Sequence, residues 1–490
     1  MNANVIPAQE SVPPLWSEEL RLIRRSLGAG SSRKILVSAH GVARLLTWCR
    51  RALAESHLVA VAATLHRALG ADLDDLRALR LPVDILEQFP RWRAGSRAGF
   101  RPRDLGLRPA AAGAGFPLRA LRLQLSPSSG TAPLALTLLR DLTRRLDPTV
   151  EFLVVAERGA DLERVRASLR GLGIADGRVR VVEAASATIY AQDNARAAVD
   201  RDGGRVLLIP RAFHAHRASV APAMEAAEAE RALGAKIVRS ALYWRGGNMV
   251  HDGERCLIGA DTMAENRARL GLTHGEIVQS FRAELGTDVV VLGDPSAARF
   301  DAEAEDLTQS AQAAFHIDLD VSLLGRFGRR RRPVALVADP ALGLRLLPHI
   351  VRHAVLSRHF IPANGARAAL AGEFVAFGRE RQAVLRAYAD VLTELGYRVV
   401  GVPDLRLRPR ANAFGAVNLG FSYCNVLPGL RGGRPAVHYL PWGVPALDRR
   451  AEARFRAAGV VPVKASSNPA IGHTLMQLSA GLRCFCGPLA

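Results

Sequence analysis

One segment of the chain, residues 314–321, carries three ionisable side chains at alternating positions. In an extended strand, His316, Asp318 and Asp320 would lie on one face while apolar side chains occupy the other. Such a row is costly to bury unless it lines a site where charged groups do chemistry. An edge strand with a solvated polar face explains the pattern equally well. A metal site is a further interpretation of the His-x-Asp-x-Asp spacing, although no other His or carboxylate cluster supports it.

Two further segments add an acid and a nucleophile. Asp193, in Tyr190-Ala191-Gln192-Asp193, precedes a polar turn and on its own is typical of an aspartate that caps local amides. Cys484 follows Arg483, and a neighbouring guanidinium can lower the pKa of a thiol and favour the nucleophilic thiolate. An inert, buried strand cysteine is the alternative. Cys486 would share a strand face with Cys484, so it is a second candidate nucleophile or one half of a redox-sensitive pair.

Together these segments resemble the guanidine-modifying enzymes of the pentein fold, in the branch that holds peptidylarginine deiminases and agmatine deiminases. The motifs occur in the order of that branch: Tyr190–Asp193 with Tyr in place of Trp, then His316-Ile317-Asp318, then Arg483-Cys484 with Arg in place of His. Two weaker matches lie between them. Gly246-Gly247-Asn248 is similar to a Glu-Gly-Gly-x segment of the agmatine deiminases, although this chain has Arg245 in place of the Glu. Residues 422–425 resemble a Ser-Tyr-x-Asn segment of the same family.

The resemblance implies a division of labour among the site residues. Asp193 and Asp318 would grip a guanidinium through paired hydrogen bonds, since its planar fork of donors matches carboxylates. Cys484 would attack the central carbon, and His316 would protonate the leaving ammonia and then activate water. No metal or organic cofactor is implied. The residues expected around the substrate, besides the two aspartates, are Gly247, Asn248, Asn425 and Tyr190.

The implied activity is a deiminase that converts arginine to citrulline and releases ammonia through a covalent Cys thiouronium intermediate. Arginine within a peptide or protein is the preferred substrate, because Arg245 replaces the Glu of the agmatine enzymes. Two alternatives remain open. An amidinotransferase would pass the same Cys adduct to an amine, and a non-enzymatic basic pentein would bind nucleic acid.

Two parts of the chain differ in the pattern of their apolar residues. Residues 1–110 predict a helical N-terminal region of unknown role that ends in an Arg/Gly/Pro-rich stretch. Residues 111–490 alternate strand-like and helical runs, which predicts a mixed α/β domain. The resemblance, which covers about 115–490, implies a five-bladed α/β propeller. Strands are expected at 118–125, 151–156, 179–183, 205–209, 236–242, 288–292, 333–337, 398–402, 435–440 and 460–463. Helices are expected at 133–146, 161–172, 220–233, 273–285, 342–355, 379–395 and 446–458. A hairpin turn is expected at 251–254.

The chain has 490 residues and a formal net charge of +20, and only three of its basic residues are lysines: Lys34, Lys236 and Lys464. The arginines are scattered and aromatic residues make up only 6%, which argues against a nucleic-acid surface despite the Arg329–Arg332 run. No secretory signal or membrane span is evident, and the five cysteines suit a reducing cytoplasm. The expected partner is an arginine-containing peptide or protein or a small guanidino substrate, and homo-oligomerisation stays open.

Overall fold

The computed structural model describes most of the chain from residue 102 onwards. The described ranges are 102–110, 113–125, 132–157, 162–174, 176–184, 189–193, 195–211, 234–301, 306–328, 332–352, 367–408, 410–412, 415–417, 420–477 and 480–489. The expected helical region 1–110, apart from its last nine residues, lies outside them, as do the expected helix at 220–233 and most of the Arg329–Arg332 run. Residues 108 and 109 form strand β1 (Arg108–Pro109), which pairs with the α/β body.

Five sheets of three or four strands make up the described α/β body. In spatial order, the first contains β22 (Gly487–Leu489), β2 (Ala120–Leu125), β3 (Glu151–Glu157) and β4 (Val179–Ala184). The second contains β1, β5 (Arg196–Val199), β6 (Arg205–Ile209) and β7 (Lys236–Arg239). The third contains β8 (Met249–His251), β9 (Arg255–Gly259) and β10 (Asp288–Leu292).

The fourth sheet contains β13 (Val321–Gly325), β14 (Val334–Asp339), β15 (Arg398–Arg406) and β18 (Gly420–Ser422). The fifth contains β19 (Leu427–Arg431), β20 (Arg434–Tyr439) and β21 (Val461–Lys464). Two hairpins accompany them, β11 (Arg299–Asp301) with β12 (Asp306–Gln309), and β16 (Arg410–Asn412) with β17 (Gly415–Val417). Every one of the five sheets contains an antiparallel pair next to a parallel pair.

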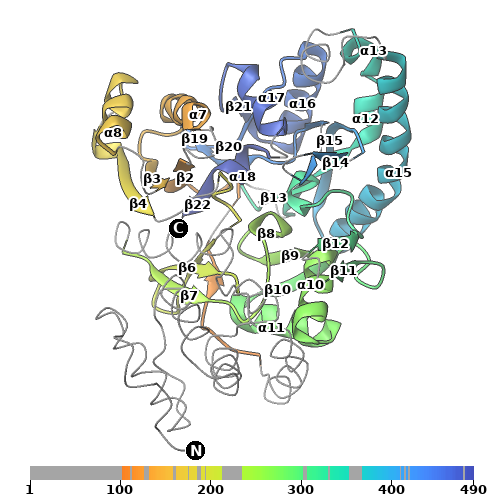
Figure 1. Cartoon of the computed structure of the whole chain (residues 1–490), viewed down its shortest axis with the longest axis horizontal. Coiled ribbons are helices and arrows are strands. Elements are labelled where there is room, and N and C mark those ends of the chain that lie inside the picture. The colour runs from red at the N-terminus through yellow and green to blue at the C-terminus, as the bar shows by residue number, and fades with distance from the viewer. Residues whose placement is uncertain are drawn as a thin grey trace, which may run out of the picture.

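Within the described ranges, helices connect the parallel strands of the first, third, fourth and fifth sheets, as such crossovers require. They are α7 (Ala132–Arg145), α8 (Leu162–Gly171), α10 (Ala260–Leu270), α11 (His274–Leu285), α12 (Pro340–Leu344), α13 (Leu347–Ile350), α15 (Arg367–Glu394) and α16 (Pro445–Ala458). Two more helices, α17 (Pro469–Gln477) and α18 (Leu482–Phe485), precede β22. In Figure 1 the longer helices lie towards the outside, and β8, β13, β22 and α18 lie nearer the middle. None of the helices in the described ranges is long and apolar enough to cross a membrane.

The alternation predicted from the sequence is confirmed. Each expected strand is present, and so is the hairpin, where β8 and β9 pair across residues 252–254. The expected helix at 342–355 is wrong in extent, because the described chain forms two short helices there, α12 and α13. The helix expected at 379–395 begins earlier, at Arg367. Helix α11 begins where predicted because Thr273 and Glu276 form a reciprocal capping box.

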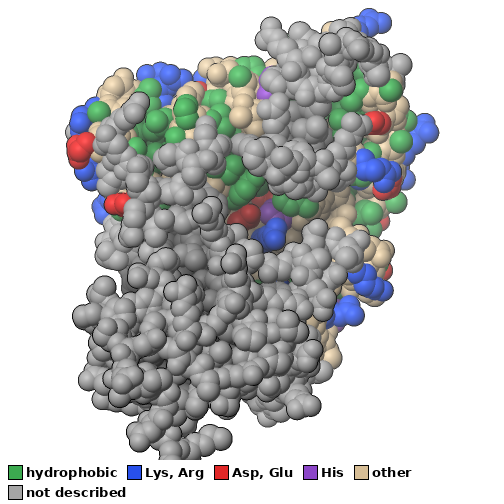
Figure 2. All heavy atoms as spheres, viewed as in Figure 1, with side chains coloured by type: hydrophobic (Ala, Val, Ile, Leu, Met, Phe, Trp, Pro, Cys, Tyr) green, Lys and Arg blue, Asp and Glu red, His purple; other side chains and the backbone are tan. Residues whose placement is uncertain are grey.

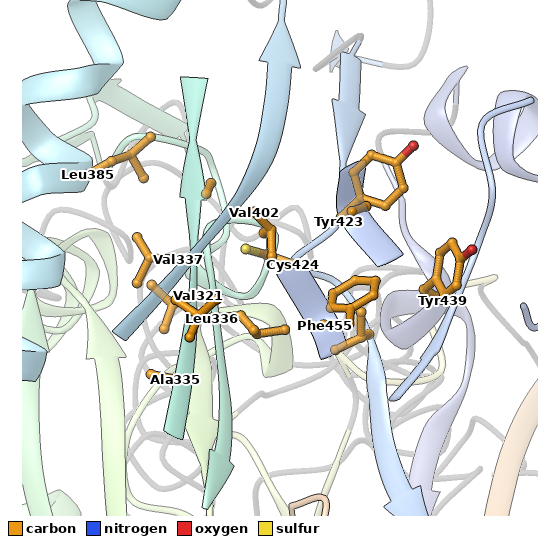
Figure 3. Close-up of a cluster of buried hydrophobic side chains, with 14 of the residues drawn as sticks. Val321, Ala335, Leu336, Val337, Leu385, Val402, Tyr423, Cys424, Tyr439 and Phe455 are labelled. Carbon is orange, nitrogen blue, oxygen red and sulfur yellow. The ribbon is translucent and has the colours of Figure 1, made fainter. Parts of the chain in front are cut away.

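The largest hydrophobic core lies around the fourth and fifth sheets. Strand β14 reads Val-Ala-Leu-Val-Ala-Asp and is buried along nearly its whole length, as expected for a strand between two neighbours with both faces covered. Figure 3 shows side chains from several elements meeting there: Val321, Ala335, Leu336, Val337, Leu385, Val402, Tyr423, Cys424, Tyr439 and Phe455. This core supports β13 and Val426, which directly precedes β19, so it lies beneath the strands that follow two of the predicted site segments.

Candidate active site

The predicted site residues occupy equivalent places in the five sheets. Each of them lies at most three residues before one strand of the antiparallel pair in its sheet. Asp193 precedes β5, Gly247 precedes β8, Asp318 precedes β13, Asn425 precedes β19 and Cys484 precedes β22. Backbone hydrogen bonds join some of these segments directly, from Gln192 N to Cys484 O at 3.2 Å and from Gly246 N to Asp193 O at 3.4 Å. The fold therefore brings together residues that are far apart in sequence.

Asp318 lies at the centre of this cluster and is fully buried. Its Oδ2 accepts hydrogen bonds from Asn425 Nδ2 at 2.9 Å and from Gln192 Nε2 at 3.0 Å. The same oxygen lies 3.9 Å from Cys484 Sγ, and Asn425 Nδ2 lies 3.3 Å from that sulfur. A thiol, a carboxylate and an amide thus meet at one point.

The nucleophile candidate lies within a short helix. The strand expected around Cys484 is wrong, because residues 482–485 form α18 and the strand β22 begins only at Gly487. Asn425 fixes this turn, since its Oδ1 accepts from Arg483 N at 2.6 Å and from Cys484 N at 3.3 Å. Gly481 precedes the helix, and a Cβ there would clash with Asn425. Cys486 is buried and is not hydrogen-bonded to Asp318 or Asn425, in contrast to Cys484.

His316 and Asp193 form the second half of the site. His316 Nδ1 lies 4.0 Å from Asp193 Oδ1, and that oxygen accepts from Gly247 N at 3.1 Å. A Cβ on Gly247 would overlap the His316 ring, so a side chain there would displace the imidazole. The Asp193 side chain remains 21% exposed, whereas that of His316 is 4% exposed. Figure 2 shows acidic, basic and histidine side chains side by side near the middle of one face.

Two other expected residues have different surroundings. Asn248 Oδ1 accepts from Ile317 N at 3.1 Å and from Gln312 Nε2 at 3.0 Å, so its amide oxygen supports the segment that carries His316. Tyr190 is partly buried, and burial, together with the charges of Asp193 and Cys484, raises its pKa to about 12. Tyr190 therefore stands beside the cluster as a neutral phenol.

The strand expected at 314–321 is wrong. Residues 317–319 form a 3-10 turn, η5 (Ile317–Leu319), so the side chains do not alternate across a sheet. Asp318 consequently meets Cys484, whereas Asp320 forms ion pairs with Arg381 and Arg406. The polar residues of this segment are buried rather than solvated, which removes the edge-strand alternative.

Burial controls the protonation of the site. It raises the pKa of Asp318 to about 7, against the opposing charges of Arg483 and Arg196. It lowers the pKa of His316 to about 4, against the charge of Asp193. Burial and the two aspartates raise the pKa of Cys484 well above its ordinary value, so the expected lowering of this pKa by Arg483 is wrong for the free site. At neutral pH the unliganded site therefore holds a neutral imidazole and a protonated thiol.

Sequence reasoning missed the roles of Gln192 and of the buried Arg196, and it placed Arg483 beside Cys484 without predicting its burial. Gln192 was part of a motif, but an uncharged amide gave no signal of its contact with Asp318. Arg196 is buried and binds the backbone oxygens of Gly246 and Met249 through Nη2. The side-chain Nε and Nη1 atoms of Arg483 are buried without a hydrogen-bond partner among the described residues.

Several site atoms are buried with no hydrogen-bond partner in the part of the chain that the structure describes. They are both ring nitrogens of His316, Oδ1 of Asp318 and Oε1 of Gln192. Unsatisfied buried acceptors are costly, and they are typical of a site that awaits a ligand with its own donors. Within the described ranges, no group of three or more His, Cys, Asp or Glu side chains could hold a metal ion.

No protein-family model matches the chain, and no curated protein matches it significantly. Among solved structures, a provisionally assigned agmatine deiminase has a TM-score of 0.50 and 12% identity, with 78% of this chain and 96% of that chain covered. The agmatine deiminase of Enterococcus faecalis has a TM-score of 0.49 and 12% identity over 80% and 98% of the two chains. DDAH from Pseudomonas aeruginosa has a TM-score of 0.30 and 12% identity over 76% and 99%. The resemblance read from the motifs is thus confirmed at the level of architecture, and this chain has the pentein fold of the guanidino-modifying enzymes.

Proposed function

We propose that this protein is a guanidino hydrolase that converts an arginine side chain to citrulline and releases ammonia. One observation carries the proposal: Cys484 Sγ lies 3.9 Å from Asp318 Oδ2, while the other oxygen of that carboxylate has no partner among the described residues. A carboxylate in this position can hold a guanidinium with its central carbon next to the sulfur. Asp193, which remains partly exposed, supplies the second carboxylate.

Substrate charge activates the thiol in this proposal. Burial and the two carboxylates raise the pKa of Cys484, so the free site favours the thiol. A bound guanidinium introduces a permanent positive charge beside the sulfur, which offsets both carboxylates and favours the thiolate. The nucleophile therefore forms when substrate is in place.

The chemistry then proceeds in two halves. The thiolate of Cys484 attacks the guanidino carbon, and the thiol proton is received by His316. His316 passes that proton to the leaving ammonia, and a C–N bond breaks to leave the thiouronium adduct. Water attacks the adduct, His316 accepts a proton from it, and the C–S bond breaks to release the ureido product. Asp193 stabilises the imidazolium formed in each half, since its carboxylate lies 4.0 Å from His316 Nδ1.

The proposed substrate is arginine within a peptide or protein. Arg245 is exposed, and its charge acts on His316, so a cation stands at the edge of the site. Agmatine carries a second positive charge, on its amine, which this arginine would repel. Peptidyl-arginine carries no charge there beyond the guanidinium. Its reaction requires no metal or organic cofactor.

The architecture and location complete the proposal. We propose that the five sheets are five related units around a central axis, because each contributes a site segment ahead of its antiparallel pair. We further propose that residues 1–110 form a separate region and 111–490 the catalytic domain. We also propose a cytoplasmic location, which is supported by the free thiols of Cys256, Cys424, Cys484 and Cys486.

Incubation with peptidyl-arginine, free arginine and agmatine tests the activity. The proposal expects equal amounts of ureido product and ammonia, with peptidyl-arginine turned over fastest. A parallel incubation with added amine acceptors distinguishes hydrolysis from amidino transfer, because an amine that captures the adduct forms a new substituted guanidine in place of the ureido product. Absence of ureido product from all three substrates would rule the proposal out.

A further inference from the structure

The segment that carries His316 and Asp318 is held by two buried arginines. We call residues 313–320 the site loop. Arg381 of α15 donates from Nε to Ala313 O at 2.9 Å and from Nη2 to Asp320 Oδ1 at 2.6 Å. One guanidinium therefore binds the first and the last residue of the loop. Because its fork is planar and rigid, it fixes the distance between these two ends.

Arg406, at the end of β15, holds the second end of the loop. Its Nη2 donates to Leu319 O at 2.5 Å and lies 3.1 Å from Asp320 Oδ1. Ser422 of β18 donates to the same Leu319 oxygen at 2.7 Å. Leu319 directly follows Asp318, so these bonds fix the backbone next to the carboxylate that faces Cys484.

Asp404 joins the two arginines. It accepts from Arg381 Nη1 through Oδ2 and from Arg406 Nε through Oδ1 at 3.0 Å. Arg381, Arg406, Asp320 and Asp404 thus form a neutral cluster of four charges, each at most 3% exposed. Apolar residues of similar volume would often stabilise a fold as well as such a buried cluster does. Its contribution to stability alone therefore does not account for it.

We propose that Arg381, Arg406, Asp320 and Asp404 are positioning residues that hold His316 and Asp318 in register with Cys484. This inference rests on the guanidino chemistry proposed above. The cluster touches neither the thiol nor the free oxygen of Asp318, and it acts through the backbone of the site loop. Lysine cannot replace Arg381, because a single ammonium has no planar fork to span Ala313 O, Asp320 and Asp404.

The test compares two reagents on one thiol. Both 2-chloroacetamidine and 2-chloroacetamide alkylate a cysteine by forming a C–S bond and expelling chloride, but only the amidine is a planar cation. Alkylation of Cys484 is followed by mass spectrometry of the peptide that contains it. The rate constant for the amidine divided by that for the amide measures how well the carboxylates are aligned with the sulfur. A partly unfolded protein would also lose this preference, so the ratio is compared only among variants whose circular dichroism spectrum and Tm match those of the wild type.

The wild-type protein is expected to react faster with the amidine. Arg381→Lys should reduce the ratio by about 10- to 100-fold, the cost of a small misplacement in a preorganised site. Ser422→Ala removes one anchor of the loop without removing a charge, and it should reduce the ratio by a smaller factor. Arg178→Lys is the matched control, since Arg178 donates to Val150 O, Thr143 O and Asp147 O far from the loop.

The outcomes separate the two proposals. A wild-type protein that does not prefer the amidine contradicts the proposed guanidino chemistry itself. If the wild type prefers the amidine and Arg381→Lys keeps that preference, only the positioning role is overturned. The same holds if the preference for the amidine falls as far in Arg178→Lys as in Arg381→Lys. If Arg381→Lys fails to fold, an unchanged ratio in Ser422→Ala is enough to overturn the inference.

Discussion

At the scale of single residues, the site depends on one carboxylate. Asp318 contacts the two amides and the thiol through one oxygen and leaves the other for a ligand. Burial also makes it the site group whose protonation changes nearest to neutral pH. The pH dependence of activity should therefore follow this residue.

We predict that kcat/KM falls as the pH drops below about 7, where Asp318 takes up a proton and loses its charge attraction for a guanidinium. His316, with a pKa of about 4, does not titrate in this range. A pH–rate profile measures the acidic limb. In Asp318→Asn that limb should disappear, together with a loss of about 100-fold or more in kcat/KM. An unchanged acidic limb in this variant would assign the titration to another group.

Arg245 sets the charge at the exposed edge of the site. Replacing it by glutamate should raise kcat/KM for agmatine about 10-fold or more relative to peptidyl-arginine, because repulsion of the agmatine amine becomes attraction. Competition between the two substrates in one reaction measures this ratio directly. Arg205→Glu, which changes an exposed arginine at the start of β6, is the charge-matched control. Equal ratios in the two variants would show that only net charge matters.

At the scale of elements, short turns ahead of five strands build the site. The glycines of η4 (Gly246–Asn248) allow its backbone to approach Asp193 and His316. Gly247 is the critical one, since it both donates to Asp193 and lies against the imidazole.

Gly247→Ala should lower kcat by about 100-fold, since the added methyl group displaces the His316 ring. Steady-state kinetics measure the loss. The matched control is Gly171→Ala at the end of α8, where an added Cβ meets nothing within 4 Å. That control should keep full activity and gain up to about 1 kcal/mol of stability, because alanine favours the helix. Full activity in Gly247→Ala would contradict the position of His316.

The elements also show how far the sequence could be read. Continuous apolar runs such as 334–339 gave reliable strands, but β1 and β22 are too short to produce a periodic pattern. The His-x-Asp-x-Asp segment revealed its residue types but not its turn, because alternating polar residues suit strands and turns alike. The two aspartates differ only in their tertiary contacts: Asp318 lies beside Cys484, whereas Asp320 forms ion pairs with two arginines. Those partners lie far along the chain, where local spacing carries no signal.

At the scale of the whole molecule, the charge of +20 contrasts with an aspartate-containing site. Some of the arginines that give this positive charge lie inside the fold: Arg122, Arg196, Arg381, Arg406 and Arg483 are buried. Buried arginines cannot neutralise phosphates at a surface. Net charge is therefore a poor guide to the partner of this protein.

Binding to duplex DNA or single-stranded RNA should accordingly be weak at physiological salt. A titration over a range of salt concentrations measures it, and we expect a shallow dependence of log affinity on log salt. A steep negative slope, equivalent to the release of several counterions, would instead support the basic nucleic-acid-binding alternative. Cys484→Ala should leave this titration unchanged in either case.

The central claim is that Cys484 carries out hydrolysis of a guanidino group. The most direct test is turnover of an arginyl peptide in water enriched in heavy oxygen, with the product analysed by mass spectrometry. We predict citrulline that contains the heavy oxygen, formed by the wild type and by Cys486→Ala but not by Cys484→Ala. Citrulline formation that persists in Cys484→Ala, or its absence with the wild type, would contradict the account.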